Sequence, residues 1–302
     1  MMRIKKKYSI SGMISLFVIL ISSFTFNQSF SENISDYNDN NIKSYLLSKT
    51  LEAEIDKVST ILEITSKLPE IRKSPNATLL SETIETYNGI PELSEQEKRN
   101  VLKNIVLNYD DISGAAFLMH NGDMYIREPF NEQLNLNKTN LSFREYYKGA
   151  LQTGAIYMDN VIISVATEKP IAVTAIPIFA NNTLEKIESN KEIVGILYST
   201  LNFNVPNQLL KSLNLTNSER VVYLDHLGNK IADSSKIAPQ NETSIFSNLQ
   251  SFNNSISGIS GTIIEDVNNT KMIISYNPVK SVQNTWALLW MKPHTNDMDL
   301  TS

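Results

Sequence analysis

Cysteine is absent from the 302 residues, and histidine occurs only three times. Without cysteine the chain has no disulfide, no thiolate zinc site, no iron–sulfur cluster and no cysteine nucleophile. Three histidines are too few for a histidine-rich metal site. The sequence also lacks a phosphate-binding glycine loop and a dinucleotide-binding fingerprint. We therefore expect neither a metal nor a cofactor.

Positive charge is also scarce once the first residues are set aside. The chain has 27 basic and 32 acidic residues, which gives a net charge of −5. Arg3, Lys5, Lys6 and Lys7 precede any acid, so the rest carries 23 basic against 32 acidic residues, a balance of −9. Such a body repels phosphates, and no basic stretch with interleaved aromatic residues occurs. We therefore exclude nucleic acid as a partner.

One long apolar run follows the basic start. Residues 8–26 contain no charged side chain, and about 20 apolar residues suffice to cross a bilayer as a helix. The preceding positive residues favour a cytoplasmic start, which predicts a single-pass cell-membrane protein with an extracellular body. The alternative is a signal peptide cleaved near Ser29-Phe30-Ser31, which would give a secreted protein. We assign residues 1–31 to this segment and favour the anchor, because the run is long for a signal peptide.

Residues 41–68 have the periodicity of one long amphipathic helix. Leu47, Leu51, Ile55, Val58 and Leu62 follow one another at intervals of 4, 4, 3 and 4 residues, which forms one apolar stripe. Pro69 is expected to end it. The stripe either packs on a folded domain or forms a parallel homodimer. We favour packing, since the heptad pattern is too short to indicate a coiled coil.

Strand patterns then occur in two similar sets. The first comprises residues 115–119, 124–126, 169–179 and 193–203, with a tight turn at Asn121-Gly122. The second comprises residues 220–224, 230–232, 271–278 and 285–291. Pro177 and Pro278 are each expected to end a strand, because proline cannot donate to a central ladder. Hairpins with helical insertions predict an α+β fold with antiparallel sheets.

The repetition divides the body into two modules. We place the first at residues 69–205 and the second at 206–293, with the boundary at Val205-Pro206 and a tail at 294–302. Each module would hold one antiparallel sheet, and both modules would follow the one long helix. The two modules would therefore stand in tandem after the apolar segment.

Several short motifs resemble one known family. They are Ser142 to Ala150, similar to the family's F-R-x-W/Y-Y-x-x-A box, then Ile156 to Asp159, Lys169-Pro170, Thr174 to Ile178, Leu224-Asp225 with Gly228, and Ile231 to Ser234. In order and spacing they resemble the double Cache sensor domain, in which two PAS-like modules share one long N-terminal helix outside a membrane. The resemblance covers residues 41–293. It implies a small extracellular ligand in the first module, and an output domain beyond a second membrane segment. Because no second segment precedes Ser302, we expect either a truncated receptor or a stand-alone sensor or binding protein that passes its signal to an unknown signalling partner.

The box places the candidate ligand-binding residues. Arg144 comes first, because a guanidinium grips a carboxylate with two parallel hydrogen bonds. Tyr146 and Tyr147 would wall a pocket, and Tyr157, Asp159 and Thr200 are weaker candidates. Alternatively, Arg144 forms an internal salt bridge with Glu145 or Asp159, and the tyrosines are core residues.

The same resemblance bears on the ligand. Amino-acid-binding relatives have a tyrosine where this sequence has Thr139, and an aspartate where it has Ser199 or Thr200. A buried ammonium without a counter-charge is costly, so an amine-free carboxylate, a small organic acid or a related metabolite, fits better than an α-amino acid.

Three functions compete. We favour a non-enzymatic, membrane-anchored extracellular sensor of such an acid. A surface structural or interaction protein without a pocket is the second, and an extracellular hydrolase is the third. Adjacent acids such as Asp110-Asp111 diverge and would not flank a glycosidic bond, and the histidines fall in predicted turns or near the end of the chain. A cavity beside Arg144, Tyr146 and Tyr157 would favour the sensor.

Overall fold

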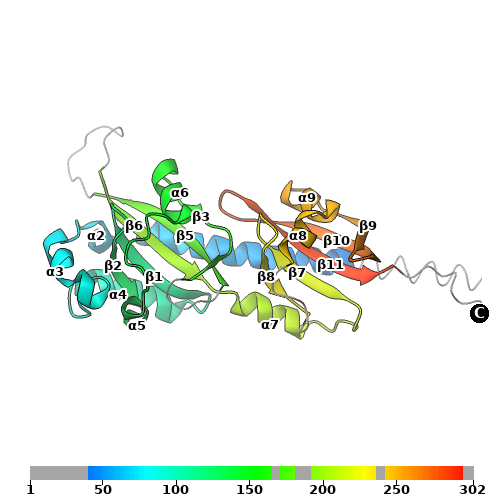
Figure 1. The fold of residues 1–302 in the computed structure, drawn as a ribbon, viewed down its shortest axis with the longest axis horizontal. Helices are drawn as coiled ribbons and strands as arrows, with labels where there is room; N and C mark the ends of the chain where they lie inside the picture. Colours follow the sequence, from blue (N-terminus) through cyan, green and yellow to red (C-terminus); the bar gives the residue numbers. More distant parts are fainter. Residues whose placement is uncertain (1–39, 165–169, 181–191, 236–241, 295–302) are drawn as a thin grey trace, which may run out of the picture. The chain divides into compact units, whose positions relative to one another are not determined.

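A computed structural model gives the fold and describes residues 40–164, 170–180, 192–235 and 242–294 (Figure 1). The apolar run at 8–26 and most of the tail lie outside these ranges. Within them, none of the helices combines the length and the apolar character that crossing a bilayer requires.

A long helix spans residues 40–65. Leu47, Leu51, Ile55, Val58 and Leu62 are all buried, each at most 6% exposed, so the predicted stripe is covered within the chain. Pro69 does not directly end this helix, which stops at Thr65. It begins the short helix α2 (Pro69–Arg72) instead, where the missing N–H of proline costs no hydrogen bond.

Two further helices precede the first sheet. Helix α3 (Ala77–Tyr87) begins at Asn76, whose side chain accepts a hydrogen bond from the Leu79 N–H. Helix α4 (Gln96–Asn108) packs against the first two strands.

The first sheet is antiparallel. Its strands are β1 (Ile112–Met119), β2 (Met124–Glu128), β3 (Tyr157–Met158), β4 (Ile162–Ile163), β5 (Pro170–Phe179) and β6 (Ile193–Leu201). The order is β2-β1-β6-β5-β3, and β4 also pairs with β5. Gly122 has a φ of +90° in the β1–β2 turn, and a Cβ there would lie 2.7 Å from Ser142. Glycine at this turn thus lets the chain before helix α6 (Glu145–Thr153) pass close to the hairpin.

The second sheet repeats this arrangement. Its strands are β7 (Arg220–Leu224), β8 (Lys230–Asp233), β9 (Gly261–Val267), β10 (Thr270–Lys280) and β11 (Thr285–Pro293), in the order β8-β7-β11-β10-β9. The helices near it are α7 (Asn204–Ser212), α8 (Thr243–Ser247) and α9 (Gln250–Ile256). Each sheet thus places a hairpin at one edge and a second antiparallel pair beside it, so the fold mixes helices with two antiparallel sheets, as predicted.

The two prolines do not end their strands, which corrects the sequence prediction. Pro177 lies within β5 opposite Ile196, and Pro278 lies within β10 opposite Ala287. On the other side, β3 pairs with β5 only as far as Ala175, and β9 pairs with β10 only as far as Tyr276. Each proline therefore stands where one neighbouring strand has already ended, and its missing N–H interrupts no ladder on that side.

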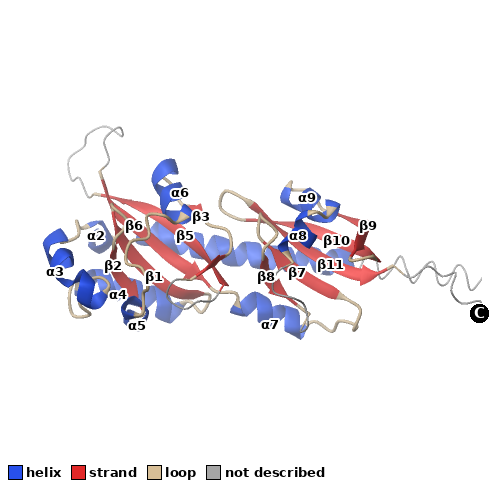
Figure 2. Cartoon of the chain, in the orientation of Figure 1, coloured by secondary structure: helices blue, strands red, loops and turns tan. Residues whose placement is uncertain are grey.

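Helices pack on both faces of each sheet (Figure 2). On one face, side chains of both sheets join the stripe of the long helix in a single apolar cluster that includes Phe117 and Trp286. On the other, α6 packs on β3 and β5 of the first sheet, and α9 packs on β9, β10 and β11 of the second. Side chains of both sheets therefore bury the apolar stripe of the long helix.

The segment from Met158 to β4 is hydrogen-bonded to two hairpin turns of the second sheet, β7–β8 and β10–β11. The buried Asp225 carboxylate accepts from the Val161 N–H at 2.9 Å, as well as from Leu227 and Asn229 in its own turn. The Gln283 side chain accepts from the Met158 N–H at 2.9 Å and donates to the Met158 carbonyl at 2.5 Å. This segment, which borders the candidate site, is therefore held at two points.

Candidate functional site

Strand register brings the candidate site together on the α6 face of the first sheet. Across five strands, Arg127 pairs with Ala116, Ala116 with Tyr198, Tyr198 with Ala175, and Ala175 with Tyr157. Directly paired residues point to the same face. Long side chains therefore alternate with alanines along one row of this face.

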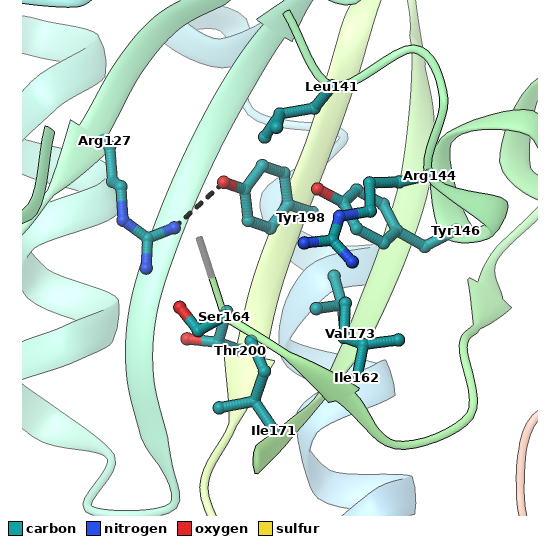
Figure 3. Close-up of a pocket in the computed structure, with 10 residues that line it drawn as sticks. All are labelled: Arg127, Leu141, Arg144, Tyr146, Ile162, Ser164, Ile171, Val173, Tyr198 and Thr200. Atoms are coloured by element: carbon teal, nitrogen blue, oxygen red, sulfur yellow. Dashed lines mark hydrogen bonds between the residues drawn. The ribbon is translucent and has the colours of Figure 1, made fainter. Parts of the chain in front are cut away.

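A cavity lies over this part of the sheet (Figure 3). It is lined by Arg127, Leu141, Arg144, Tyr146, Ile162, Ser164, Ile171, Val173, Tyr198 and Thr200. About 20 Å³ is open to the centre of a water molecule, which is room for about one water. Two arginines and two tyrosines therefore surround a small cavity whose other walls are largely apolar.

Arg127 lies at the inner end and is 3% exposed. Its Nε and Nη2 donate to Glu132 Oε2 at 3.1 and 2.6 Å, and its Nη1 donates to the Tyr198 hydroxyl at 2.9 Å. Gly114 makes room for it, since a Cβ there would lie 2.9 Å from Arg127 Nη2. The buried guanidinium is therefore neutralised by one carboxylate and tied to one phenol.

Tyr198 and Tyr146 form the aromatic wall. Their ring centroids are 5.2 Å apart with the planes inclined at 44°, and both side chains are buried. Burial raises the pKa of each phenol above its ordinary value of 10, although the positive charge of Arg127 opposes the shift. Both hydroxyls therefore keep their protons at neutral pH and can donate hydrogen bonds.

Arg144 lies at the outer end, on the opposite side of Tyr198 from Arg127 in Figure 3. It is the N-cap residue of α6, partly exposed, and its Nη2 donates to the Ile163 carbonyl at 3.0 Å. Glu145 pairs with Lys148 instead. Within the described ranges no carboxylate lies at ion-pair distance from Arg144. The internal salt bridge that the sequence left open is therefore not formed there.

Asp159 is buried but does not line the cavity. Its carboxylate accepts hydrogen bonds from the backbone N–H groups of Asn160 and Tyr146. Burial raises its pKa from the ordinary value, and these two hydrogen bonds oppose that shift. Asp159 thus holds the first turn of α6 in place, which positions Arg144 and Tyr146.

Of the six predicted residues, Arg144, Tyr146 and Thr200 line the cavity. Thr200 donates to the Gly114 carbonyl at 3.2 Å. The Tyr147 hydroxyl donates to the His120 carbonyl at 2.5 Å. The ring of Tyr157 packs beneath Gly149, where a Cβ would lie 2.5 Å from it. Tyr147, Tyr157 and Asp159 therefore surround the site without lining it.

Sequence reasoning missed Arg127, Ser164 and Tyr198. An arginine and a glutamate at the end of a short hairpin strand resemble a solvent-exposed pair, yet all five residues of β2 are buried. The signal that could have revealed Arg127 and Tyr198 is the strand register. A pairing that places Arg127 opposite Ala116, and Ala116 opposite Tyr198, brings both long side chains to one face of the sheet. In the described part of the chain, no group of acids and histidines is arranged to hold a metal ion.

Comparisons with known proteins place this fold. The chain matches the sequence model of the Cache domain over residues 23–296. A search of the curated proteins found no match.

Among solved structures, the ligand-binding domain of the Pseudomonas fluorescens chemoreceptor CtaA with L-isoleucine has a TM-score of 0.59 at 12% identity, covering 89% of this chain and 96% of that one. The ligand-binding domain of the Pseudomonas aeruginosa amino acid chemoreceptor PctC with GABA has a TM-score of 0.54 at 11% identity, covering 82% and 95%. That of PctB from the same organism, with L-Arg, has a TM-score of 0.52 at 14% identity, covering 87% and 96%.

At these identities the structural likeness concerns the fold alone. The family match covers most of the chain and agrees with the two sheets and the motifs from which the resemblance was first drawn. The chain therefore belongs to the Cache domain family.

Proposed function

We propose that the chain is the extracellular sensor part of a membrane-anchored signal-transduction protein and binds a small carboxylate in the cavity beside Arg144. The observation that carries this proposal is a guanidinium at a cavity without an ion-pair partner in the described residues. A carboxylate would supply that partner through two parallel hydrogen bonds. The protonated hydroxyls of Tyr146 and Tyr198 add further donors that suit an anion.

The ligand would be an acid without an amine. Glu132 is engaged by Arg127, and Asp159 caps α6. An ammonium would therefore meet two guanidiniums and no free carboxylate among the described residues near the cavity. The solved relatives named above hold amino acids or GABA, so this chain would differ from them in its ligand.

Binding requires the cavity to open. Its present volume holds about one water, whereas an organic acid has several heavy atoms. Arg144 and Ile162 of β4 are the partly exposed members of the lining, so the Arg144 side chain and β4 would move outward to admit the ligand.

The site test is a thermal-shift screen of organic acids and amino acids on the full chain in mild detergent, followed by calorimetry. Because a charged hydrogen bond contributes about 1.5–3 kcal/mol, Arg144→Ala should weaken binding of the best acid by roughly tenfold to more than a hundredfold. Arg144→Lys should recover only part, since a point charge cannot replace the two-pronged contact.

Lys148→Ala is the matched control, because it removes an exposed positive charge from the same helix. Equal affinity of Arg144→Ala and the parent would make Arg144 a structural residue. A best ligand that is an amine would instead make Asp159 the leading contact.

The proposed membrane topology follows from the apolar run and the two modules identified in the sequence. Residues 8–26 would anchor the chain in the cell membrane, with modules at 69–205 and 206–293 outside and a separate protein receiving the signal. Protease added to intact cells should then remove the body. Protection of residues beyond Asn41 would reverse this topology.

A further inference from the structure

Among the described residues around the cavity, one positive charge has no ion-pair partner. The guanidinium of Arg127 and the carboxylate of Glu132 are 2.6 Å apart and cancel. Among the described residues, Arg144 donates to the Ile163 carbonyl, lies 5.0 Å from the centroid of the Phe143 ring, and is attracted by the charge of Asp159 without forming an ion pair. A ligand that matches this balance carries a single negative charge at the outer end.

The inner end offers donors without net charge. Arg127 has five side-chain N–H groups, and its side-chain hydrogen bonds to the described residues use three of them, two to Glu132 and one to Tyr198. The Tyr198 hydroxyl accepts from Arg127, so its own proton is available to a ligand. Because the local charge is already cancelled, this end suits an uncharged acceptor such as a hydroxyl or carbonyl oxygen.

Other ligand ends fit less well. A second carboxylate would have to compete with Glu132 for Arg127. An ammonium would place donors against donors, and an alkyl end would leave the inner donors without an acceptor. Between the two ends, Leu141, Ile171 and Val173 provide an apolar wall.

We infer that the cavity selects small monocarboxylates whose far end carries an uncharged acceptor, and that Glu132 determines this selectivity by cancelling the charge of Arg127. The inference rests on the proposed function and adds to it the ligand class and the residue that sets it. Removing the Glu132 charge should free Arg127 and turn the site toward dicarboxylates.

The test compares acids of equal length on the full chain by calorimetry. The three-carbon set is lactate, pyruvate, propionate, malonate and alanine, and the four-carbon set is succinamate, butyrate, succinate and GABA. The parent should bind lactate, pyruvate or succinamate at least roughly tenfold tighter than the dicarboxylate of the same length, and alanine and GABA most weakly. In Glu132→Gln the dicarboxylate should gain roughly tenfold or more relative to its monocarboxylate partner.

Glu145→Gln is the matched control, because it removes an exposed acid that pairs with Lys148 and does not line the cavity. It should leave the order of ligands unchanged. A parent that prefers dicarboxylates, or equal effects of the two glutamine variants, would overturn the inference while the proposed function stands. Failure of every acid to bind the parent would overturn both.

Glu132→Gln leaves a buried arginine unpaired, so a second variant guards against loss of folding. Tyr198→Phe keeps the ring and removes the inner hydroxyl donor. The preference for lactate over propionate should then fall by roughly two- to tenfold. An unchanged ratio in a folded Tyr198→Phe protein would also overturn the inference.

Discussion

Glu54 is an acid placed where its charge is poorly compensated. It lies half-buried on the long helix, and its Oε2 has no hydrogen-bond partner among the described residues. Burial, reinforced by the nearby charge of Asp111, raises its pKa from 4.5 to about 7. Lys57 opposes the shift but is itself bonded to Asp111. The folded chain thus holds a proton on Glu54 that the unfolded chain releases at lower pH.

This arrangement predicts a pH-dependent gain from Glu54→Gln. For an acid with a raised folded pKa, stability falls as pH rises from the unfolded value of 4.5 to about 7 and is then level. The substitution should raise the free energy of unfolding by about 1–2 kcal/mol at pH 8, after discounting for solvent screening, and by little at pH 4.5. Urea unfolding at both pH values measures it.

Glu63→Gln, at an exposed position of the same helix, is the control for this experiment. A gain from Glu54→Gln that is the same at both pH values would show that the charge is not the cause.

At the scale of elements, the short strands β3 and β4 depend on the second sheet for their position. Gln283 in the β10–β11 turn bonds both the N–H and the carbonyl of Met158, and Asp225 accepts from Val161. Ile162, a few residues on, lines the cavity, and Asp159 caps the helix that begins beside Arg144. The geometry of the site thus rests on residues 64 and 125 positions later in the chain.

Gln283→Ala should therefore weaken ligand binding although Gln283 does not line the cavity. Loss of two hydrogen bonds of about 1 kcal/mol each would let the β3–β4 segment shift, and we expect an affinity loss of roughly three- to thirtyfold. Calorimetry with the best acid measures it. Gln96→Ala is the control, since that exposed side chain bonds the Glu92 carbonyl on the surface and does not contact the β3–β4 segment among the described residues. Equal affinities of both variants would argue that the segment is held in other ways.

At the scale of the whole molecule, the apolar stripe of the long helix packs on the folded body, as the sequence analysis favoured, and is not available as a dimer contact. Its five residues are buried by the two sheets. The apolar residues that remain exposed on this helix include Leu46 and Ile64, at 58% and 60%. They are 18 residues apart, which is five helical turns, so they share one side. Lysines 49 and 57 lie between them, which limits the apolar area.

We therefore expect a weak dimer through the outer side of the helix. Sedimentation of the full chain should show a mass that rises with concentration, and Leu46→Glu should abolish the rise by placing a charge in the contact. Leu227→Glu alters an equally exposed leucine in the β7–β8 turn and should have no effect. A strict monomer at high concentration would contradict this expectation.

Local patterns were sufficient for most of the fold and for part of the site. The period of the long helix, the glycine turns and the strand alternation are properties of neighbouring residues, so the elements could be predicted from them. The strand ends at Pro177 and Pro278 could not, because they depend on where another strand stops. Arg127 could not, because its burial depends on Tyr198, 71 positions away. Arg144 was found through its motif, whereas the cavity's inner end arises only from the pairing of strands.

The two contacts that hold the β3–β4 segment have a thermodynamic consequence. Met158 and Val161 form these hydrogen bonds with Gln283 and Asp225 in two hairpin turns of the second sheet. A bound acid that changes the free energy of these hydrogen bonds therefore also changes the free energy of the turns. Binding free energies are reciprocal, so a protein that docks on those turns and strains them would change the affinity for the acid by an equal factor. Titrating the acid with and without the docked protein would then measure the strength of signalling without observing any motion.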